Sequence, residues 1–209
     1  GSGTLFKYGQ ENVVSTDEFE IIIPKDALYH NILFCYSTEK STDPNKTIYR
    51  IHTSRTPLHK KFTLRVKQVS ANLKYPEKGY LGYLDGKGIE YCESRVTNEY
   101  IEATCGKFGS YMVLMDTIPP QISPVKVRYN SDISDENQLK FRLTDNTGIN
   151  SYNGYIDDRW ILLEWDPKTK MLAYTFDRQR VAPKAWHRLK VEVTDKLDNK
   201  SEFIGKFFW

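Results

Sequence analysis

Histidines are the residues of this chain best suited to metal chemistry, and the sequence holds four of them: His30, His52, His59 and His187. A catalytic zinc site uses three protein ligands beside an open position for water or substrate. Two of those ligands usually come from closely spaced residues, yet no two of these histidines are separated by a single residue. His52 and His59 could converge on a metal, but ordinary positions at strand ends explain them more simply. We therefore predict no catalytic residue and no metal ligand among the four.

Two adjacent carboxylates, Asp157 and Asp158, are the nearest approach to an acid–base pair. Neighbouring side chains on a strand point to opposite faces of the sheet, so the two could not act together on one substrate. The chain also lacks a Gly-x-Ser-x-Gly nucleophile motif, a Walker-type phosphate loop and a Cys-x-x-Cys motif. The glycines of "YLDGKGIE" precede no helix pattern that could bind a phosphate, so this stretch predicts a hairpin turn. The sequence predicts that this chain is not an enzyme.

Two loops rich in aspartate, "TDNTG" (Thr144–Gly148) and "DKLDN" (Asp195–Asn199), raise the question of calcium. A calcium site needs several oxygen ligands that converge on one point. The loops could share one end of a β-sandwich, but Asx side chains that cap the backbone of a turn are the simpler interpretation. The prediction for this chain is accordingly no metal and no cofactor.

Aromatic residues gather between Tyr152 and Trp165, where Tyr155 and Trp160 also lie. Exposed rings can stack on sugars or anchor a protein interface. The run Trp160–Trp165 has large apolar side chains at both alternating positions, which indicates a strand covered on both sides, with Trp160 or Trp165 in a core or a domain interface. Tyr152 and Tyr155 are then the more exposed pair, and they are the weak candidates for ligand binding.

The three cysteines, Cys35, Cys92 and Cys105, form no disulfide framework because their number is odd. Cys92 and Cys105 could face each other across adjacent strands. Alternatively, all three are buried thiols that act as small apolar side chains. The sequence leaves both possibilities open.

Composition favours a packed all-β protein. Of the 209 residues, 39% are hydrophobic and 27% charged, and Tyr (14) and Phe (10) are far more frequent than Met (3). The net charge of +3 is too small for a nucleic-acid-binding surface, and no run approaches the length of a membrane span. We recognise no signal peptide, and expect no transmembrane segment and no nucleic-acid partner.

Short strand patterns follow one another along the whole chain. Runs such as "FEIII", "FTLRVKQV", "WILLEW" and "HRLKVEVTD" are rich in β-branched or aromatic residues and end at turn residues. The stretch "DTIPPQISPV" interrupts them, and its prolines, Pro119 and Pro120, can continue neither a strand ladder nor a helix. The prediction is two tandem β-sandwich domains, immunoglobulin-like in architecture, covering residues 1–118 and 119–209 and joined by a short Pro-Pro connector.

Three groups of proteins have similar motifs. "DTIPPQIS", "LTDNTGI" and "VTDKLDNKS" together resemble bacterial immunoglobulin-like modules, although Asp198 stands where those modules commonly have glycine. "IPKDAL" is similar to a turn of ZU5-like β-domains, which implies that residues 1–118 form a ZU5-like domain and residues 119–209 the immunoglobulin-like one. Over most of the chain, "EIIIPKDALYHNILFCY", "IHTSRTPLHKKFTLRVK", "GSYMVLMDTIPP", "GYIDDRWILLEWDPKTKMLAYTFD" and "HRLKVEVTDKLDNKSEF" resemble the region after the catalytic domain of Bacteroidetes peptidases of the M23 class, which are lysostaphin-like zinc enzymes.

The last resemblance implies a function. It makes the chain a non-catalytic accessory region that positions or regulates a zinc catalytic domain acting on peptidoglycan, with zinc expected only in that domain. The implied partners are the upstream catalytic domain of the same chain and peptidoglycan or a surface glycan. The implied location is the cell envelope, either periplasmic or surface-exposed. The alternative is a surface adhesion or glycan-binding module.

Overall fold

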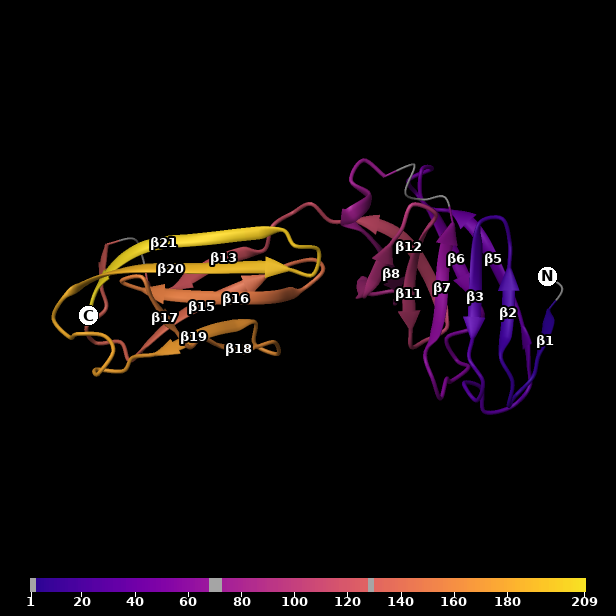
Figure 1. Ribbon diagram of the computed structural model, residues 1–209, viewed down its shortest axis with the longest axis horizontal. Helices are drawn as coiled ribbons and strands as arrows, with labels where there is room; N and C mark the ends of the chain where they lie inside the picture. Colours follow the sequence, from indigo (N-terminus) through magenta and orange to yellow (C-terminus); the bar gives the residue numbers. More distant parts are fainter. Residues whose placement is uncertain (1–2, 68–72, 128–129) are drawn as a thin grey trace. The chain divides into compact units, whose positions relative to one another are not determined.

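The computed structural model describes residues 3–67, 73–127 and 130–209, and these residues are built almost entirely from β-strands. The chain divides into two compact units, Gly1–Asp116 and Thr117–Trp209. Each unit consists of layered, mostly antiparallel sheets (Figure 1). The prediction of an all-β protein with tandem sandwich domains is confirmed.

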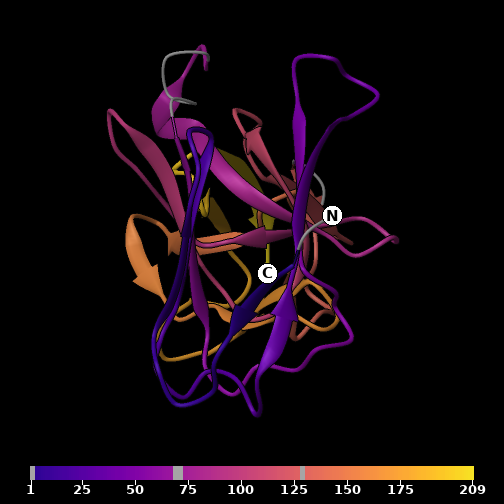
Figure 2. The ribbon, with the colours of Figure 1, turned by 90° about the vertical axis from the view of Figure 1, so that its right-hand side faces the viewer.

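The first unit places two five-stranded sheets face to face, in the orders β10-β11-β7-β3-β2 and β5-β6-β12-β8-β9, while β1 pairs with β4. The strands are β1 (Thr4–Phe6), β2 (Asn12–Ser15), β3 (Phe19–Ile23), β4 (Ile32–Phe34), β5 (Tyr36–Lys40), β6 (Thr47–Ile51), β7 (Phe62–Lys67), β8 (Gly79–Leu84), β9 (Ile89–Cys92), β10 (Ser94–Val96), β11 (Tyr100–Cys105) and β12 (Gly109–Met115), with a 3-10 turn, η2 (Pro76–Lys78), before β8. Strand β5 is exposed at every position, and the loop after it extends from the body of the unit (Figure 2).

The core of the first unit follows from alternation along its central strands. In β3 and β7, every second side chain is buried, beginning with Phe19 and Phe62 respectively. Phe62 packs against Phe108 and Tyr111. Burial of one such aromatic or branched side chain stabilises the fold by about 1.5–3 kcal/mol.

The second unit is a sandwich of a four-stranded sheet, β13-β15-β19-β18, and a five-stranded sheet, β14-β21-β20-β16-β17. Its strands are β13 (Gln121–Val125), β14 (Ser131–Asp132), β15 (Gln138–Thr144), β16 (Ile149–Ile156), β17 (Arg159–Ile161), β18 (Glu164–Asp166), β19 (Met171–Thr175), β20 (Trp186–Asp195) and β21 (Lys200–Phe208). In β20, Leu189, Val191 and Val193 are buried, as their alternation with polar residues predicts. They belong, together with Phe141 and Phe207, to a separate core.

The double proline lies at the start of the second unit. Pro120 is buried, and its carbonyl accepts a hydrogen bond from the Ser201 hydroxyl in the last hairpin of that unit. Strand β13 begins directly after it. The boundary between the two units falls after Asp116, two residues before the boundary predicted after Ile118.

Candidate functional site

Two of the four histidines make structural hydrogen bonds with their ring nitrogens. His187 is buried, with Nδ1 at 2.7 Å from the Asp157 carboxylate and Nε2 at 2.8 Å from the Ala182 carbonyl oxygen. His52 lies against Thr56 and Cys35, and burial lowers its pKa. Within residues 3–67, 73–127 and 130–209, no group of three metal-ligating side chains includes a histidine.

Asp157 and Asp158 form a tight turn rather than part of a strand, which corrects the sequence interpretation. They have φ angles of 49° and 64° and join β16 to β17. A two-residue hairpin turn of this hand requires positive φ at both central positions, and aspartate tolerates that conformation better than most residues. Asp157 also accepts the Arg188 N–H, and Asp158 forms an ion pair with the Arg188 guanidinium.

The contact between Asp157 and His187 looks like part of a catalytic relay, but the second ring nitrogen is engaged. Because His187 Nε2 donates to the Ala182 carbonyl, it cannot take a proton from a nucleophile. Burial works to raise the pKa of Asp157, but the hydrogen bonds from His187 and the Arg188 N–H outweigh burial and lower it. This pair therefore fastens β20 to the β16–β17 turn.

The two aspartate-rich loops lie at the same end of the second unit. Asp145 follows β15, and its Oδ2 accepts hydrogen bonds from the backbone N–H groups of Thr147 and Gly148, both at 2.8 Å. The Lys196 N–H donates to the Gly148 carbonyl at 3.1 Å and joins this loop to the turn after β20. The two loops that the sequence singled out are therefore in contact in the folded chain.

Asp195, the last residue of β20, is completely buried. Its Oδ1 accepts hydrogen bonds from the N–H groups of Leu197 and Asn199, both at 2.8 Å, and its Oδ2 accepts one from the Asn199 side-chain amide at 2.7 Å. One carboxylate thus organises the whole turn between β20 and β21, where Asp198 has a φ of 58°.

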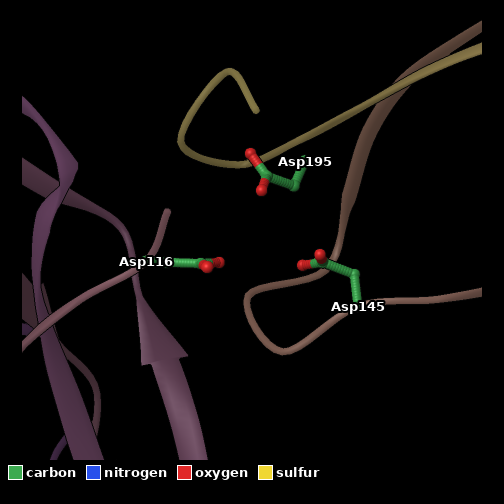
Figure 3. A group of neighbouring side chains, drawn as sticks. All are labelled: Asp116, Asp145 and Asp195. Atoms are coloured by element: carbon green, nitrogen blue, oxygen red, sulfur yellow. The ribbon is translucent and has the colours of Figure 1, made fainter. Parts of the chain in front are cut away.

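The carboxylates of Asp145 and Asp195 each offer an oxygen to a common space, and these oxygens lie within 4.8 Å of one another (Figure 3). Oδ1 of Asp145 is buried and has no hydrogen-bond partner in the described part of the chain. Burial raises the pKa of Asp145, the turn N–H groups oppose the rise, and the charge of Asp195 adds to it. Asp116, also labelled in Figure 3, is the last residue of the first unit.

This pair of carboxylates in the second unit can hold a proton or contribute to the binding of a cation. Calcium takes six to eight oxygen ligands, and two carboxylates supply only a part of such a set. A shared proton needs no further ligand, because two carboxylates at short range cannot both ionise without cost. Proton sharing is the chemistry that the pair can perform by itself.

The aromatic residues of the second unit divide between its core and its surface. Tyr152 and Trp165 pack partly against the core, while Trp160 is 52% exposed. Tyr155 is half-buried and lies under the Lys190 ammonium group, 5.7 Å from the ring centroid. Of the two tyrosines predicted as a pair, Tyr155 lies on the outer sheet face, and Tyr152 points toward the core.

The strand that contains Trp160 is covered on one side, not on both. Ile161 and Leu163 are buried, whereas Trp160 and Leu162 are 52% and 61% exposed. Strand β17 is the edge of its sheet, and only the inner face of that sheet meets the other layer. Trp160 is therefore the exposed ring that the sequence interpretation missed, and the alternation of positions 160 to 163 was the available signal.

Cys92 and Cys105 face each other, whereas Cys35 is exposed. The Cys105 thiol forms a hydrogen bond with Cys92 that lowers the Cys92 pKa, and this hydrogen bond together with burial raises the pKa of Cys105. Both line a pocket of about 310 Å³ with Lys61 and Lys107. The alternative that all three thiols are buried is wrong, because Cys35 is exposed and Cys92 is only partly buried.

Comparison with known proteins identifies the first unit. Residues 3–116 match the family model of the Zu5-like domain. No curated protein matches the chain. The described residues include no helix long and apolar enough to cross a membrane.

Proposed function

The chain belongs to the Zu5-like domain family, and from this membership we propose that it is a non-catalytic accessory region of a larger cell-envelope protein. The motifs shared with Bacteroidetes M23-class peptidases make a zinc endopeptidase acting on peptidoglycan the proposed parent. The upstream catalytic domain of the same chain is then its partner, and the periplasm or the cell surface its location. Zinc belongs to that domain, and no cofactor is proposed for residues 1–209.

The observation that carries the proposal is the engagement of His187. It is the buried histidine of the chain and has a carboxylate partner, yet both ring nitrogens are held by structural hydrogen bonds. A general base must be free to accept a proton from the reacting group. This histidine and its carboxylate partner therefore stabilise the fold, which suits a region that acts by position.

The mechanism that we propose is positional. The stretch Thr117–Pro120 includes two prolines with fixed φ, so few backbone rotations are available between the units. A short, stiff connector limits how far a catalytic domain attached to one end can move relative to whatever the other end contacts. The region would thereby change the substrate preference or the rate of its parent enzyme.

Deletion of residues 1–209 from the parent tests this role. We expect cleavage of cross-linked muropeptides by the shortened enzyme to change in rate or in substrate preference. The chain alone, supplied with zinc, should release no product from the same muropeptides. Unchanged cleavage after the deletion, or turnover by the chain alone, would contradict the proposal.

A second candidate function is surface adhesion or glycan binding. The specific observation that favours it is Trp160, whose ring is half exposed on the outer face of a sheet. An exposed tryptophan offers a flat apolar surface beside a polar N–H, which suits the alternating apolar and hydroxyl faces of a sugar ring.

A further inference from the structure

We propose that the outer sheet face of the second unit binds an acidic saccharide at its β17 edge, with Trp160 stacking on the sugar ring and Arg159 and Arg180 holding its carboxylate. The inference deepens the glycan-binding candidate and rests on it. It does not depend on the accessory role proposed for a peptidase.

A row of side chains crosses four strands of this sheet face. Trp160 on β17 pairs with Tyr155 on β16, Tyr155 pairs with Lys190 on β20, and Lys190 pairs with Ile204 on β21. Directly opposed residues on antiparallel strands have Cβ atoms about 4.5–5.5 Å apart. Two aromatic rings therefore stand next to each other at the β17 end of the row, followed by an ammonium group.

The ring of Trp160 is held as well as exposed. Its indole N–H donates to the Asn153 side-chain oxygen at 3.4 Å, on the neighbouring strand. The Lys190 ammonium group lies over Tyr155 and forms ion pairs with Glu192 and Glu202 at 2.6 and 3.3 Å. Rings that are fixed before binding lose little conformational freedom when a ligand arrives.

A small pocket opens beside Trp160 at the same sheet edge. It has a volume of about 200 Å³, and Ile156, Ile161 and Val181 form its apolar side. Its polar lining is Arg159, Gln179 and Arg180. This volume suits a carboxyl-bearing substituent rather than a whole disaccharide, since pockets that enclose drug-sized ligands begin at about 300 Å³.

The charge of this pocket favours a carboxylate. Arg159 forms no ion pair within the described parts of the chain. Arg180 forms one long ion pair, at 4.0 Å from Asp177, and both of these side chains are well exposed, so the pair is weak. A guanidinium group binds a carboxylate through two parallel N–H donors. One tryptophan face beside two arginines thus matches a pyranose ring that carries a carboxylate.

The rest of the outer face argues against a protein partner. Beyond Tyr155 the face carries Lys190, which forms ion pairs with both Glu192 and Glu202, and the exposed side chain of Ile204. The centre of a protein interface is usually depleted of charged residues. A saccharide, in contrast, uses charged and amide groups as hydrogen-bond partners around a single stacking ring.

Calorimetric titration of the whole chain with three sugars tests the proposal. Two of them carry a carboxylate, one on the lactyl ether of muramic acid and the other on C6 of glucuronate, and both are used as disaccharides. The third is neutral chitobiose. We expect at least one acidic sugar to bind at least tenfold more tightly than chitobiose, and the preferred one identifies the carboxylate source.

Variants then locate the site. Trp160→Ala should weaken binding at least tenfold, and Arg159→Gln combined with Arg180→Gln should remove the preference for the acidic sugar. Trp186→Ala is the matched control, because this tryptophan of the same unit is 55% exposed and lies outside the pocket. Its affinity should equal that of the unaltered chain, and all variants should keep the unaltered melting temperature.

Several results would overturn the inference: no binding of any of the three sugars, equal binding by the Trp160→Ala variant, or equal loss in the Trp186→Ala variant. A chain that self-associates through Trp160 in sedimentation and binds no sugar would assign this face to a second copy instead. None of these outcomes bears on muropeptide cleavage by the parent, so the accessory role would fail or survive separately.

Discussion

The carboxyl group of Asp145 should make the stability of the fold depend on pH. Its pKa in the folded chain is raised above the ordinary value of 3.8, so the folded state holds the proton more tightly than the unfolded state does. The stabilisation is fully present below the unfolded pKa and is lost as the pH rises through the folded pKa. Above the folded pKa, ionisation of Asp145 beside Asp195 comes at a cost to stability.

Asp145→Asn should therefore raise the melting temperature at pH 7 by a few degrees. The asparagine oxygen can still accept from the Thr147 and Gly148 N–H groups, and its amide can donate toward Asp195. The gain should shrink as the pH falls toward 3.8. Thermal melts across this range provide the measurement.

Asp166→Asn is the control for this effect. Asp166 is another turn aspartate of the second unit, and hydrogen bonds from Thr169 and the Lys168 N–H lower its pKa. Its replacement should bring no gain at neutral pH. If calcium instead stabilises the unaltered chain and not the Asp145→Asn variant, the carboxylate pair holds a cation rather than a proton.

Cys92 and Cys105 make a second prediction at the residue scale, because both thiols line one pocket and each shifts the pKa of the other. Diamide should accept two hydrogens from the pair and leave a disulfide that closes a loop of about a dozen residues. Such a loop stabilises the folded state by about 3 kcal/mol. In a Cys35→Ser background, titration with a thiol reagent should then find no free thiol, and the melting temperature should rise.

The Cys105→Ser variant in the same background serves as the control. This variant has one thiol, Cys92, which cannot form a disulfide within the chain. We expect one free thiol per monomer after diamide treatment and no rise in melting temperature. Two reactive thiols remaining in the diamide-treated Cys35→Ser chain would show that the geometry of β9 and β11 does not permit the bond.

At the scale of elements, the hairpins depend on residues with positive φ. The β16–β17 turn uses Asp157 and Asp158, and the β20–β21 turn uses Asp198 with a φ of 58°. In each turn, aspartate occupies a conformation in which glycine has no steric penalty. The last hairpin is also organised by Asp195, whose carboxylate binds the N–H groups of Leu197 and Asn199.

Substitution of Asp198 tests the conformational demand of that turn. Asp198→Gly should change the free energy of unfolding by less than about 1 kcal/mol, because relief of strain is offset by the greater freedom of the unfolded chain. Asp198→Val should lower it by about 1–2 kcal/mol, because a β-branched residue is strained at positive φ. Urea unfolding of the three proteins measures both effects. A valine variant as stable as the unaltered chain would show that the turn adopts another conformation.

At the scale of the whole molecule, each unit has its own hydrophobic core. The first contains Phe62 and the second contains Phe141, and both side chains are completely buried. A core variant in one unit should therefore spare the other. Phe62→Ala and Phe141→Ala should each destabilise their own unit by about 3–5 kcal/mol.

Hydrogen exchange followed by mass spectrometry resolves this prediction by segment. The protection of backbone amides from exchange should decrease in residues 1–116 for Phe62→Ala, and in residues 117–209 for Phe141→Ala. The two variants serve as controls for each other. Equal loss of protection in both units from either variant would indicate one cooperative core.

The sequence by itself determined the fold class and the features that depend on neighbouring residues. Strand alternation has a period of two residues and reads directly from runs such as Leu189, Val191 and Val193. Turn aspartates and the proline pair are equally local signals. The absence of closely spaced zinc ligands was also visible in the residue order.

The tertiary structure alone decided which surfaces and side chains meet. Alternation shows that Trp160 and Ile161 face opposite ways, but only the packing of two sheets, which covers the inner face of each, decides that the Trp160 side is uncovered. Asp145 and Asp195 are separated by most of the second unit in sequence, and the Lys196–Gly148 hydrogen bond brings their turns together. Contacts between strands distant in sequence depend on how the sheets pack, and no local pattern specifies that packing.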